Sequence, residues 1–358
     1  MKTVKAVAFA LVAGLAMSAA AEPKYQATIT ASGYAGESTL TNFPVLVRIS
    51  GAKISDFSYS QCAANGADLS FKGVDGTTLA HEIDTWNPEG ESLVWVKVPL
   101  LATNTTFKIR WGDSDVTAST STNATWNVNY VGVWHMGEAD GVCSNSSPCG
   151  AKYDAEPKGT PANSVRYADT DAPIGYARTT SSGTAYLSIP SYDAENVGSN
   201  FTMSGWVRLD KVSGWPRLFS RKENNSDAGG WAMEMEVSYT TFALLGGENK
   251  YFVGSLPTLS NSWVHVTIVY NGTTGTVYGN GESVSSNTIN PAADNGKPLS
   301  IGASSSGGDR ACGQFDECRL MKGAASADWV KADYDTVKKP DFLTYGVARP
   351  LGFMLFVR

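Results

Sequence analysis

Histidine and cysteine are scarce in this sequence, which limits the kinds of active site that it can build. The chain has three histidines and five cysteines. Cysteine and histidine pairs at the short spacings of structural zinc sites are absent, so zinc is not expected. His81, His135 and His265 accompany no serine-elbow or cysteine-nucleophile motif. We therefore expect structural roles for all three histidines.

Basic charge is also low. The sequence has 28 Lys and Arg against 34 Asp and Glu, and neither sign forms a block. Without Lys2 and Lys5, which precede the apolar run described next, 26 basic residues remain against 34 acidic ones, a net charge of −8. Proteins that bind nucleic acid or anionic membranes carry basic patches. We therefore expect no nucleic-acid partner.

Long apolar runs are absent except at the beginning of the chain. Ala6 to Ala20 is apolar, and the small residues before Glu22 suit cleavage, so residues 1–21 are predicted to be a secretory signal peptide. The run is shorter than the roughly 20 residues that span a bilayer. We expect a secreted or cell-surface protein, of bacterial origin, with no transmembrane segment in the mature chain. The apolar tail, residues 348–358, is compatible with a closing strand, a sorting signal or a disordered end.

Short alternating strands are what the chain has in abundance. The segment 22–118 contains runs with a two-residue period. One face of the first run carries Phe43, Val45, Val47 and Ile49, and one face of a second run carries Val94, Val96 and Val98, while the residues between them point the other way. Asp75-Gly76 between two such runs is a hairpin signal. The pattern predicts an antiparallel β-sandwich here.

A Ser, Thr and Asn-rich stretch, residues 119–130, is predicted to link this sandwich to a second domain, residues 131–347. One short helix is expected, from Ser326 to Tyr334, with Ser326 as its N-cap. The fold class is therefore all-β, with two sandwich domains.

Three distant segments of the second domain share a recognisable pattern. They are Phe201 to Val207, then Trp263 to Val266 leading into Val277 to Glu282, and Gly313 to Leu320. In order and spacing they resemble the laminin-G-like or concanavalin A-like jelly roll. That resemblance implies a scaffold which carries lectins, adhesion modules and glycoside-cleaving enzymes alike.

The first domain resembles an uncharacterised bacterial family through the runs FPVLVRI, GADLSF, HEIDTW, LVWVKVP and FKIRWGD. That family recurs before laminin-G-like domains in secreted proteins, and it is also found joined to proteins of the MotA/TolQ/ExbB type. The resemblance implies a spacer or docking module.

Glu234 and Glu236 are the catalytic alternative. They share one face of the strand that begins at Trp231, roughly 6 to 7 Å apart, which suits a glycosidase carboxylate pair. Laminarinase-type jelly rolls use a Glu, Asp, Glu set on one strand, and the matching positions here hold Glu234, Glu236 and Tyr239. The third carboxylate is missing, so a pair of solvated glutamates is the competing interpretation.

Asp316 matches an aspartate that holds calcium in many jelly rolls, and Glu138 or Asp140 is its expected early partner. Calcium takes six to eight oxygens, so these carboxylates alone would not complete the site. The alternative is that Asp316 caps a turn or pairs with Arg319.

The loop around Trp215 is the best candidate for binding a sugar, because Gly and Pro mark a turn there. Non-catalytic recognition of an extracellular glycan or other polymer is the function that we predict, and a glycoside hydrolase or polysaccharide lyase and a protein-binding adhesion protein are the alternatives. The remaining candidate ligand-binding residues are polar or aromatic and lie downstream: Asn224, Asn225, Asp227 and Tyr239.

Two disulfides are expected in an exported protein, Cys143 with Cys149 and Cys312 with Cys318. The second pairing requires a turn at Gly313, because two cysteines at these positions of one straight strand would lie roughly 20 Å apart. Cys62 is the expected odd thiol.

Overall fold

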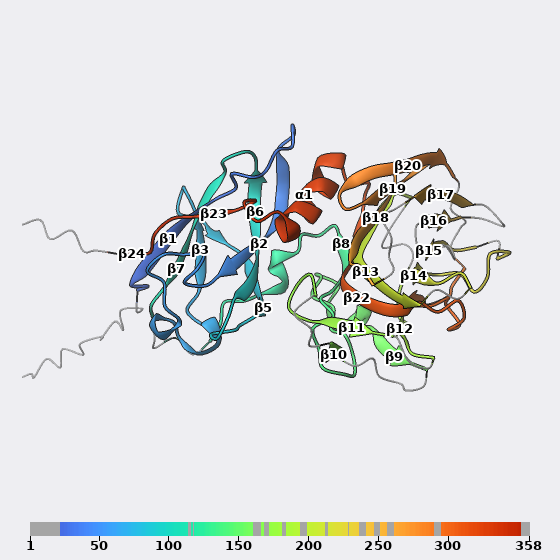
Figure 1. The fold of residues 1–358 in the computed structure, drawn as a ribbon, viewed down its shortest axis with the longest axis horizontal. Helices are drawn as coiled ribbons and strands as arrows, with labels where there is room; N and C mark the ends of the chain where they lie inside the picture. The colour runs from blue at the N-terminus through green and yellow to red at the C-terminus, as the bar shows by residue number, and fades with distance from the viewer. Residues whose placement is uncertain are drawn as a thin grey trace, which may run out of the picture.

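The part of the chain that the structure describes folds into two β-sandwiches with one α-helix between them (Figure 1). The structure is a computed structural model, and it describes residues 22–113, 116, 118–159, 166–167, 172–180, 184–193, 199–211, 214–227, 229–235, 241–246, 251–255, 261–289 and 295–351. Strands dominate the described residues, which confirms the all-β prediction. The predicted signal peptide lies outside the described residues.

The first sandwich packs a six-stranded sheet on a three-stranded sheet. The six-stranded sheet has the order β23-β1-β7-β3-β4, with β24 also paired to β1. Its strands are β1 (Tyr25–Thr30), β3 (Ser70–Gly73), β4 (Thr78–Leu79), β7 (Thr106–Trp111), β23 (Thr344–Tyr345) and β24 (Arg349–Pro350). The strands of the other sheet, in the order β2-β6-β5, are β2 (Leu40–Ile49), β5 (His81–Thr85) and β6 (Ser92–Leu101).

The predicted alternation in β2 and β6 is confirmed, and both faces of these strands are used. The inward set that includes Val45 and Val96 lies in the core of the first sandwich. The opposite set, Leu46, Leu93 and Trp95, is also buried, in a second cluster with residues of the other sandwich. Alternation identifies which residues share a face, and here the face that would be solvated in an isolated sandwich forms the interdomain contact.

The second sandwich packs an eight-stranded sheet on a seven-stranded sheet around its own core. The eight-stranded sheet has the order β10-β11-β22-β13-β18-β19-β20, with β8 also paired to β22. Its strands are β8 (Tyr130–Trp134), β10 (Arg166–Tyr167), β11 (Ala177–Thr179), β13 (Phe201–Lys211), β18 (Val264–Tyr270), β19 (Thr274–Gly279), β20 (Glu282–Thr288) and β22 (Cys312–Lys322).

The seven-stranded sheet has the order β17-β16-β15-β14-β21-β12-β9. Its strands are β9 (Glu156–Lys158), β12 (Tyr186–Ile189), β14 (Arg217–Ser220), β15 (Ala232–Met235), β16 (Thr241–Leu245), β17 (Tyr251–Ser255) and β21 (Leu299–Ile301). All pairings in both sheets are antiparallel.

Helix α1 (Ala327–Lys338) lies between the two sandwiches (Figure 1). Ser326 caps it as predicted, because its side chain accepts a hydrogen bond from the Trp329 backbone N–H at 3.2 Å. The helix continues to Lys338, four residues past the predicted end at Tyr334, and it packs against both sandwiches. Trp329 packs on Phe43 of the first sandwich at 4.8 Å, and Tyr334 packs on Trp206 of the second at 5.6 Å.

Four short 3-10 helices complete the described secondary structure: η1 (Tyr59–Gln61), η2 (Ala64–Gly66), η3 (Asn123–Thr125) and η4 (Gly150–Tyr153). η3 lies within the segment predicted as a linker. Trp126, at its end, is buried against Trp95 and Tyr130, with ring centroids 5.5 and 5.1 Å away. The connecting segment is therefore part of the interdomain packing.

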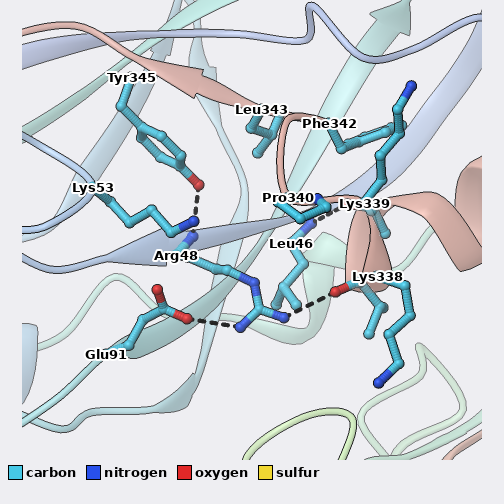
Figure 2. A pocket seen from close by; sticks show the side chains of 12 residues that line it. Leu46, Arg48, Lys53, Glu91, Lys338, Lys339, Pro340, Phe342, Leu343 and Tyr345 are labelled. Carbon is cyan, nitrogen blue, oxygen red and sulfur yellow. Dashed lines mark hydrogen bonds and ion pairs between the residues drawn. The ribbon is translucent and has the colours of Figure 1, made fainter.

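After α1 the chain returns to the first sandwich, where β23 and β24 pair with β1. Figure 2 shows the cavity of ≈ 230 Å³ that lies between this returning segment and β2. At its wall the Arg48 backbone N–H donates to Tyr345 Oη at 2.9 Å, and the Arg48 guanidinium pairs with Glu91 at 2.7 Å. Of the tail, residues 352–358 lie outside the described residues. Within the part that is described, no helix has the length and apolar character needed to cross a membrane.

Candidate functional site

Acidic and histidine side chains converge where the two sandwiches meet. β5 contributes Glu82 and Asp84, which are two residues apart and so share one face of the strand. His135 follows the last residue of β8, and Glu317 lies in β22. Among the described residues, donor atoms of Asp84, His135 and Glu317 all lie within 4.8 Å of one another. We call Glu82, Asp84, His135 and Glu317 the interdomain cluster.

A β-bulge in β22 brings two adjacent carboxylates to this side of the strand. The register against β13 shifts so that Glu317 and Cys318 stand opposite Gly205 alone, and Glu317 has a φ of 48°. Such a bulge interrupts the alternation of side chains. Phe315 and Cys318 both belong to the core of the second sandwich, whereas Asp316 and Glu317 do not. Gly205 leaves the room for the bulge, since a Cβ there would lie 3.3 Å from Cys318 Sγ.

His135 contacts all three other members of the cluster. Its Nδ1 lies 2.7 Å from Glu317 Oε1 and 3.4 Å from Asp84 Oδ2. Its Nε2 lies 3.6 Å from Glu82 Oε2. Burial alone would lower the pKa of His135, but the charges of Glu317 and Glu82 outweigh it and hold the pKa well above its ordinary value.

Glu82 of the first sandwich accepts hydrogen bonds from the second sandwich and from the connecting segment. Its Oε1 accepts a hydrogen bond from Ser146 Oγ at 2.7 Å, and its Oε2 accepts one from the Trp126 indole N–H. Burial raises the pKa of Glu82, yet the nearby His135 and the hydrogen bonds from Ser146 and Trp126 lower it more, so the net pKa is below its usual value. Glu82 is therefore an ionised partner for His135.

Burial and neighbouring carboxylates disfavour the ionised forms of Asp84 and Asp316. Burial, added to the charge of Glu317, raises the pKa of Asp84 to about 6. Asp316 is fully buried, and its Oδ2 accepts a hydrogen bond from the Ile174 backbone N–H at 2.9 Å. Its Oδ1 has no hydrogen-bond partner among the described residues. Burial and then Glu317 hold the pKa of Asp316 well above its ordinary value.

Arg319 anchors the cluster from behind. Its guanidinium pairs with Glu317 Oε2 at 2.6 Å and with Asp333 Oδ1 of α1 at 2.5 Å. It also stacks on the rings of Trp95 and Trp126, 4.4 and 4.9 Å from their centroids. The predicted alternative of an Asp316–Arg319 pair is thus replaced by Arg319 pairs with Glu317 and Asp333.

An open cavity of ≈ 220 Å³ adjoins the cluster. Its walls come from both sandwiches and are mostly polar: Glu82, Ile83, Asp84, Thr85, His135, Gly137, Glu138 and Tyr176. One Asp, one His and one Glu close together form a group that could hold a metal ion.

Of the residues predicted to bind calcium, Glu138 alone is among the lining residues of this cavity. Asp316 is next to Glu317 and buried, and Glu138 lines the cavity while its Oε1 accepts a hydrogen bond from the Ser144 backbone N–H at 2.8 Å. Asp140 is exposed. The group with converging donor atoms consists of Asp84, His135 and Glu317, and sequence reasoning proposed none of these three as ligands.

The candidate sugar-binding loop is in the second sandwich, away from the cluster in sequence. Trp215 is 45% exposed, whereas Glu234, the predicted catalytic alternative, is 2% exposed. The Arg217 guanidinium forms an ion pair with the Glu234 carboxylate, with Nε 3.2 Å from Oε2. Its Nη2 forms an ion pair with Asp309 Oδ2 at 2.8 Å and donates a hydrogen bond to Asn225 Oδ1 at 3.0 Å. Burial raises the pKa of Glu234 to about 7, although Arg217 acts against this. Glu236 and Tyr239 lie outside the described residues.

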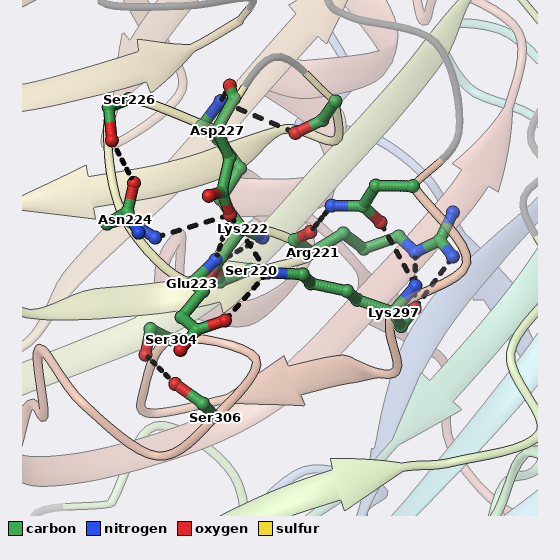
Figure 3. Close-up of polar contacts among 12 residues, drawn as sticks. Ser220, Arg221, Lys222, Glu223, Asn224, Ser226, Asp227, Lys297, Ser304 and Ser306 are labelled. Carbon is green, nitrogen blue, oxygen red and sulfur yellow. Dashed lines mark hydrogen bonds and ion pairs between the residues drawn. The ribbon is translucent and has the colours of Figure 1, made fainter.

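Figure 3 shows how the loop after β14 is organised. Asp227 Oδ2 accepts a hydrogen bond from the Glu223 backbone N–H at 2.8 Å and pairs with Lys297 Nζ at 3.1 Å. Asn224 Oδ1 accepts one from Ser226 Oγ at 2.5 Å. Asn224 and Asp227 therefore shape this loop, and Asn225 connects it to Arg217.

Comparison with protein families matches the second sandwich. Residues 181–331 match the profile of the concanavalin A-like lectin/glucanases superfamily, Laminin_G_3. The chain contains a concanavalin A-like domain. Residues 65–133 match a domain of unknown function, DUF2341, so this domain precedes the concanavalin A-like domain as the sequence analysis predicted. A search of curated proteins found no match.

Several solved structures resemble part of the chain. The binding domain of Paraclostridial Mosquitocidal Protein 1 is 17% identical, with a TM-score of 0.43, over 58% of this chain and 52% of that chain. Domain 4 of AbnA, a GH43 extracellular arabinanase from Geobacillus stearothermophilus in complex with arabinotriose, is 17% identical, with a TM-score of 0.39. The match covers 49% of this chain and 81% of that chain. The binding domain of Botulinum Neurotoxin DC in complex with SialylT is 14% identical with a TM-score of 0.42, over 60% and 53%. The chain thus spans about half the length of the first of these structures.

The disulfide prediction is wrong, because all five cysteines are free. In the second sandwich, Cys143 is buried and its sulfur contacts Met136 Sδ at 3.6 Å, while Cys149 precedes η4. Cys312 and Cys318 both lie in the continuous strand β22, so the turn that their pairing required is absent. Cys62, the predicted odd thiol, packs against the core of the first sandwich.

Two of the three histidines are in packed surroundings. His81 is 2% exposed, 5.1 Å from the Phe71 ring, and burial lowers its pKa to about 4. His265 is 4.9 Å from the Trp206 ring, and burial lowers its pKa to about 4 as well. His135 differs from both because carboxylates surround it. One feature of the sequence could have indicated the cluster. Three family-typical strand motifs contain acidic or histidine residues: HEID (81–84), VWH (133–135) and DE (316–317).

Proposed function

We propose that this protein is exported and binds an extracellular glycan through its concanavalin A-like domain without cleaving it. The observation that carries the proposal is Trp215, a large aromatic side chain that stays 45% exposed two residues before Arg217, whose guanidinium holds Asp309 and Asn225. The DUF2341 domain would then act as a spacer or docking module. The calcium ion predicted near Asp316 stays a prediction, which a melting temperature that rises with Ca²⁺ but not with Zn²⁺ would support.

The chemistry around Trp215 suits a sugar. An indole ring offers a flat apolar surface, and sugar rings have apolar C–H faces edged by hydroxyl groups. Arg217, two residues further along the chain, fixes Asp309 and Asn225 through its guanidinium. Binding groups that are already held in place lose less conformational entropy when a ligand arrives.

The charge of this region favours a neutral glycan. Asp309 has a side chain that is 32% exposed, and Glu223 lies in the neighbouring loop with 52% of its side chain exposed. Their partners, Arg217 and Lys297, are already engaged in ion pairs. An acidic polysaccharide would meet carboxylates, so we expect neutral polysaccharides to bind better.

The test is a binding assay with neutral and acidic polysaccharides, by pull-down and glycan array. We expect Trp215→Ala to weaken binding about tenfold or more, because an exposed aromatic anchor typically contributes more than ~1.4 kcal/mol. Val284→Ala is the control, since Val284 is another exposed apolar residue of the same domain, 37% exposed. Equal binding by wild type and Trp215→Ala would refute the role of this loop.

Two other results would replace the proposal. Capture of a protein partner with no glycan bound would favour the adhesion function. Release of reducing ends or unsaturated sugars that Glu234→Gln abolishes would favour the glycoside hydrolase or lyase. The second result would require the buried Glu234 carboxylate to become accessible to substrate.

A further inference from the structure

We propose that the interdomain cluster binds one divalent transition-metal ion, with Asp84, His135 and Glu317 as its ligands. The proposal concerns a different place from the Trp215 loop and does not depend on glycan binding. Sequence spacing could not suggest it, because His135 and Glu317 are 182 residues apart. Asp84 comes from the first sandwich and the other two ligands from the second.

The donor atoms already have the spacing of a coordination shell. Ligands about 2.0 to 2.2 Å from a metal ion lie roughly 3 to 4 Å from one another. His135 Nδ1 is 3.4 Å from Asp84 Oδ2 and 2.7 Å from Glu317 Oε1, and the whole group falls within 4.8 Å. Opening the His135–Glu317 contact by a few tenths of an ångström would admit the ion.

The surrounding groups are arranged as outer partners of a metal site. A ligating histidine usually hydrogen-bonds a carboxylate through its other ring nitrogen. His135 Nε2 lies 3.6 Å from Glu82 Oε2, just beyond hydrogen-bond distance, and Ser146 and Trp126 orient Glu82. The second oxygen of Glu317 is engaged by Arg319 at 2.6 Å, which leaves Oε1 directed at His135.

An unpartnered buried carboxylate oxygen points independently to a cation. Asp316 is 0% exposed, and its Oδ1 has no hydrogen-bond partner among the described residues. It precedes Glu317 at the bulge of β22, and it interacts electrostatically with Glu317, Asp84 and His135. Burying an uncompensated carboxylate is costly, and a nearby dication removes that cost.

The ligand types select the class of metal. Calcium binds through six to eight oxygens, whereas imidazole together with carboxylate suits zinc and neighbouring first-row ions. Three protein ligands leave at least one coordination position open, and the adjoining cavity of ≈ 220 Å³ gives that position access to solvent. Because the ligands come from both sandwiches, the bound ion would also stabilise their contact.

The experiment uses the tag-free mature protein, stripped with chelator and titrated with Zn²⁺ by calorimetry, with metal content measured after dialysis. We expect one equivalent of Zn²⁺ and a higher melting temperature. Asp84→Asn and His135→Gln should each weaken Zn²⁺ binding by at least about 100-fold, and Glu82→Gln by about 10-fold. Asp140→Asn, which changes an exposed carboxylate two residues after Glu138, is the control that should bind like wild type.

Circular dichroism of the stripped variants checks that they fold, and Co²⁺ loading of the wild type gives a visible absorption spectrum that requires no variant. The proposal is overturned if stripped wild type binds neither Zn²⁺ nor Co²⁺ stoichiometrically, or if Asp84→Asn and His135→Gln both bind Zn²⁺ as tightly as wild type. It is equally overturned if Zn²⁺ leaves the melting temperature unchanged while His135→Gln lowers it. In that case the cluster is an ion-pair network of protonated His135.

Discussion

Arg319 is a buried charged residue whose replacement should strongly lower the free energy of unfolding. The variant Arg319→Met tests its contribution to the packing between the two sandwiches. Its side chain is 4% exposed and pairs with Glu317 and Asp333. Methionine fills a similar volume but leaves both carboxylates without this cation. Removing one partner of a buried ion pair typically costs about 3 to 5 kcal/mol, and the lost stacking on Trp95 and Trp126 adds about 0.5 to 2 kcal/mol. We expect a loss of at least about 3 kcal/mol.

The measurement is denaturation in guanidinium chloride, followed by tryptophan fluorescence and circular dichroism. With an unchanged m-value, the shift of the midpoint gives the free-energy loss. Arg310→Ala is the matched control, because Arg310 is exposed in the same domain and should change stability by no more than about 0.5 kcal/mol. The double variant Arg319→Met/Asp333→Asn should recover about 1 kcal/mol or more relative to Arg319→Met, because it removes one of the stranded charges.

A loss below about 1 kcal/mol in Arg319→Met would refute this reasoning. It would mean that water reaches Glu317 and Asp333 and solvates them once the guanidinium is gone. Strict additivity in the double variant would likewise show that Arg319 and Asp333 do not act as a pair.

Two further predictions concern the first sandwich. Burial lowers the pKa of His81 from 6.5 to about 4, so below pH 6.5 the unfolded chain takes up a proton that the folded chain does not, and stability falls as the pH drops from 6.5 toward 4. His81→Gln should flatten this dependence by up to about 1.4 kcal/mol per pH unit in denaturation series, and parallel curves for variant and wild type would contradict the assignment. Tyr345→Phe should cost about 1 to 2 kcal/mol, because the Arg48 backbone N–H loses its acceptor at 2.9 Å. Unchanged chemical denaturation of this variant would show that water replaces the hydroxyl.

Local patterns were enough to predict much of the fold. The alternation in β2 and β6, the hairpin at Asp75-Gly76 and the Ser326 cap of α1 are all present. Each depends on residues close in sequence, whose relative directions follow from the two-residue period of a strand or from the first turn of a helix. The jelly-roll scaffold followed because its three segments pack in one core.

The candidate site was harder to predict because its residues meet only through tertiary contacts. Glu317 takes its position from a β-bulge opposite Gly205, which no alternation rule anticipates. The Cys312–Cys318 pairing failed for a related reason, since β22 runs from Cys312 past Cys318 without the turn at Gly313 that the pairing required. Spacing along the chain limits such contacts but does not determine them.

The sequence by itself determined the strand periodicity, the helix cap and the concanavalin A-like scaffold, because these depend on local geometry and on a repeated hydrophobic pattern. Only the tertiary structure decided which strand faces are buried between the sandwiches. Burial of Leu46, Leu93 and Trp95 requires the second sandwich and α1 to cover them. The same contact places Asp84 beside His135, 3.4 Å apart, because two domains that pack on each other bring together side chains that no local rule relates.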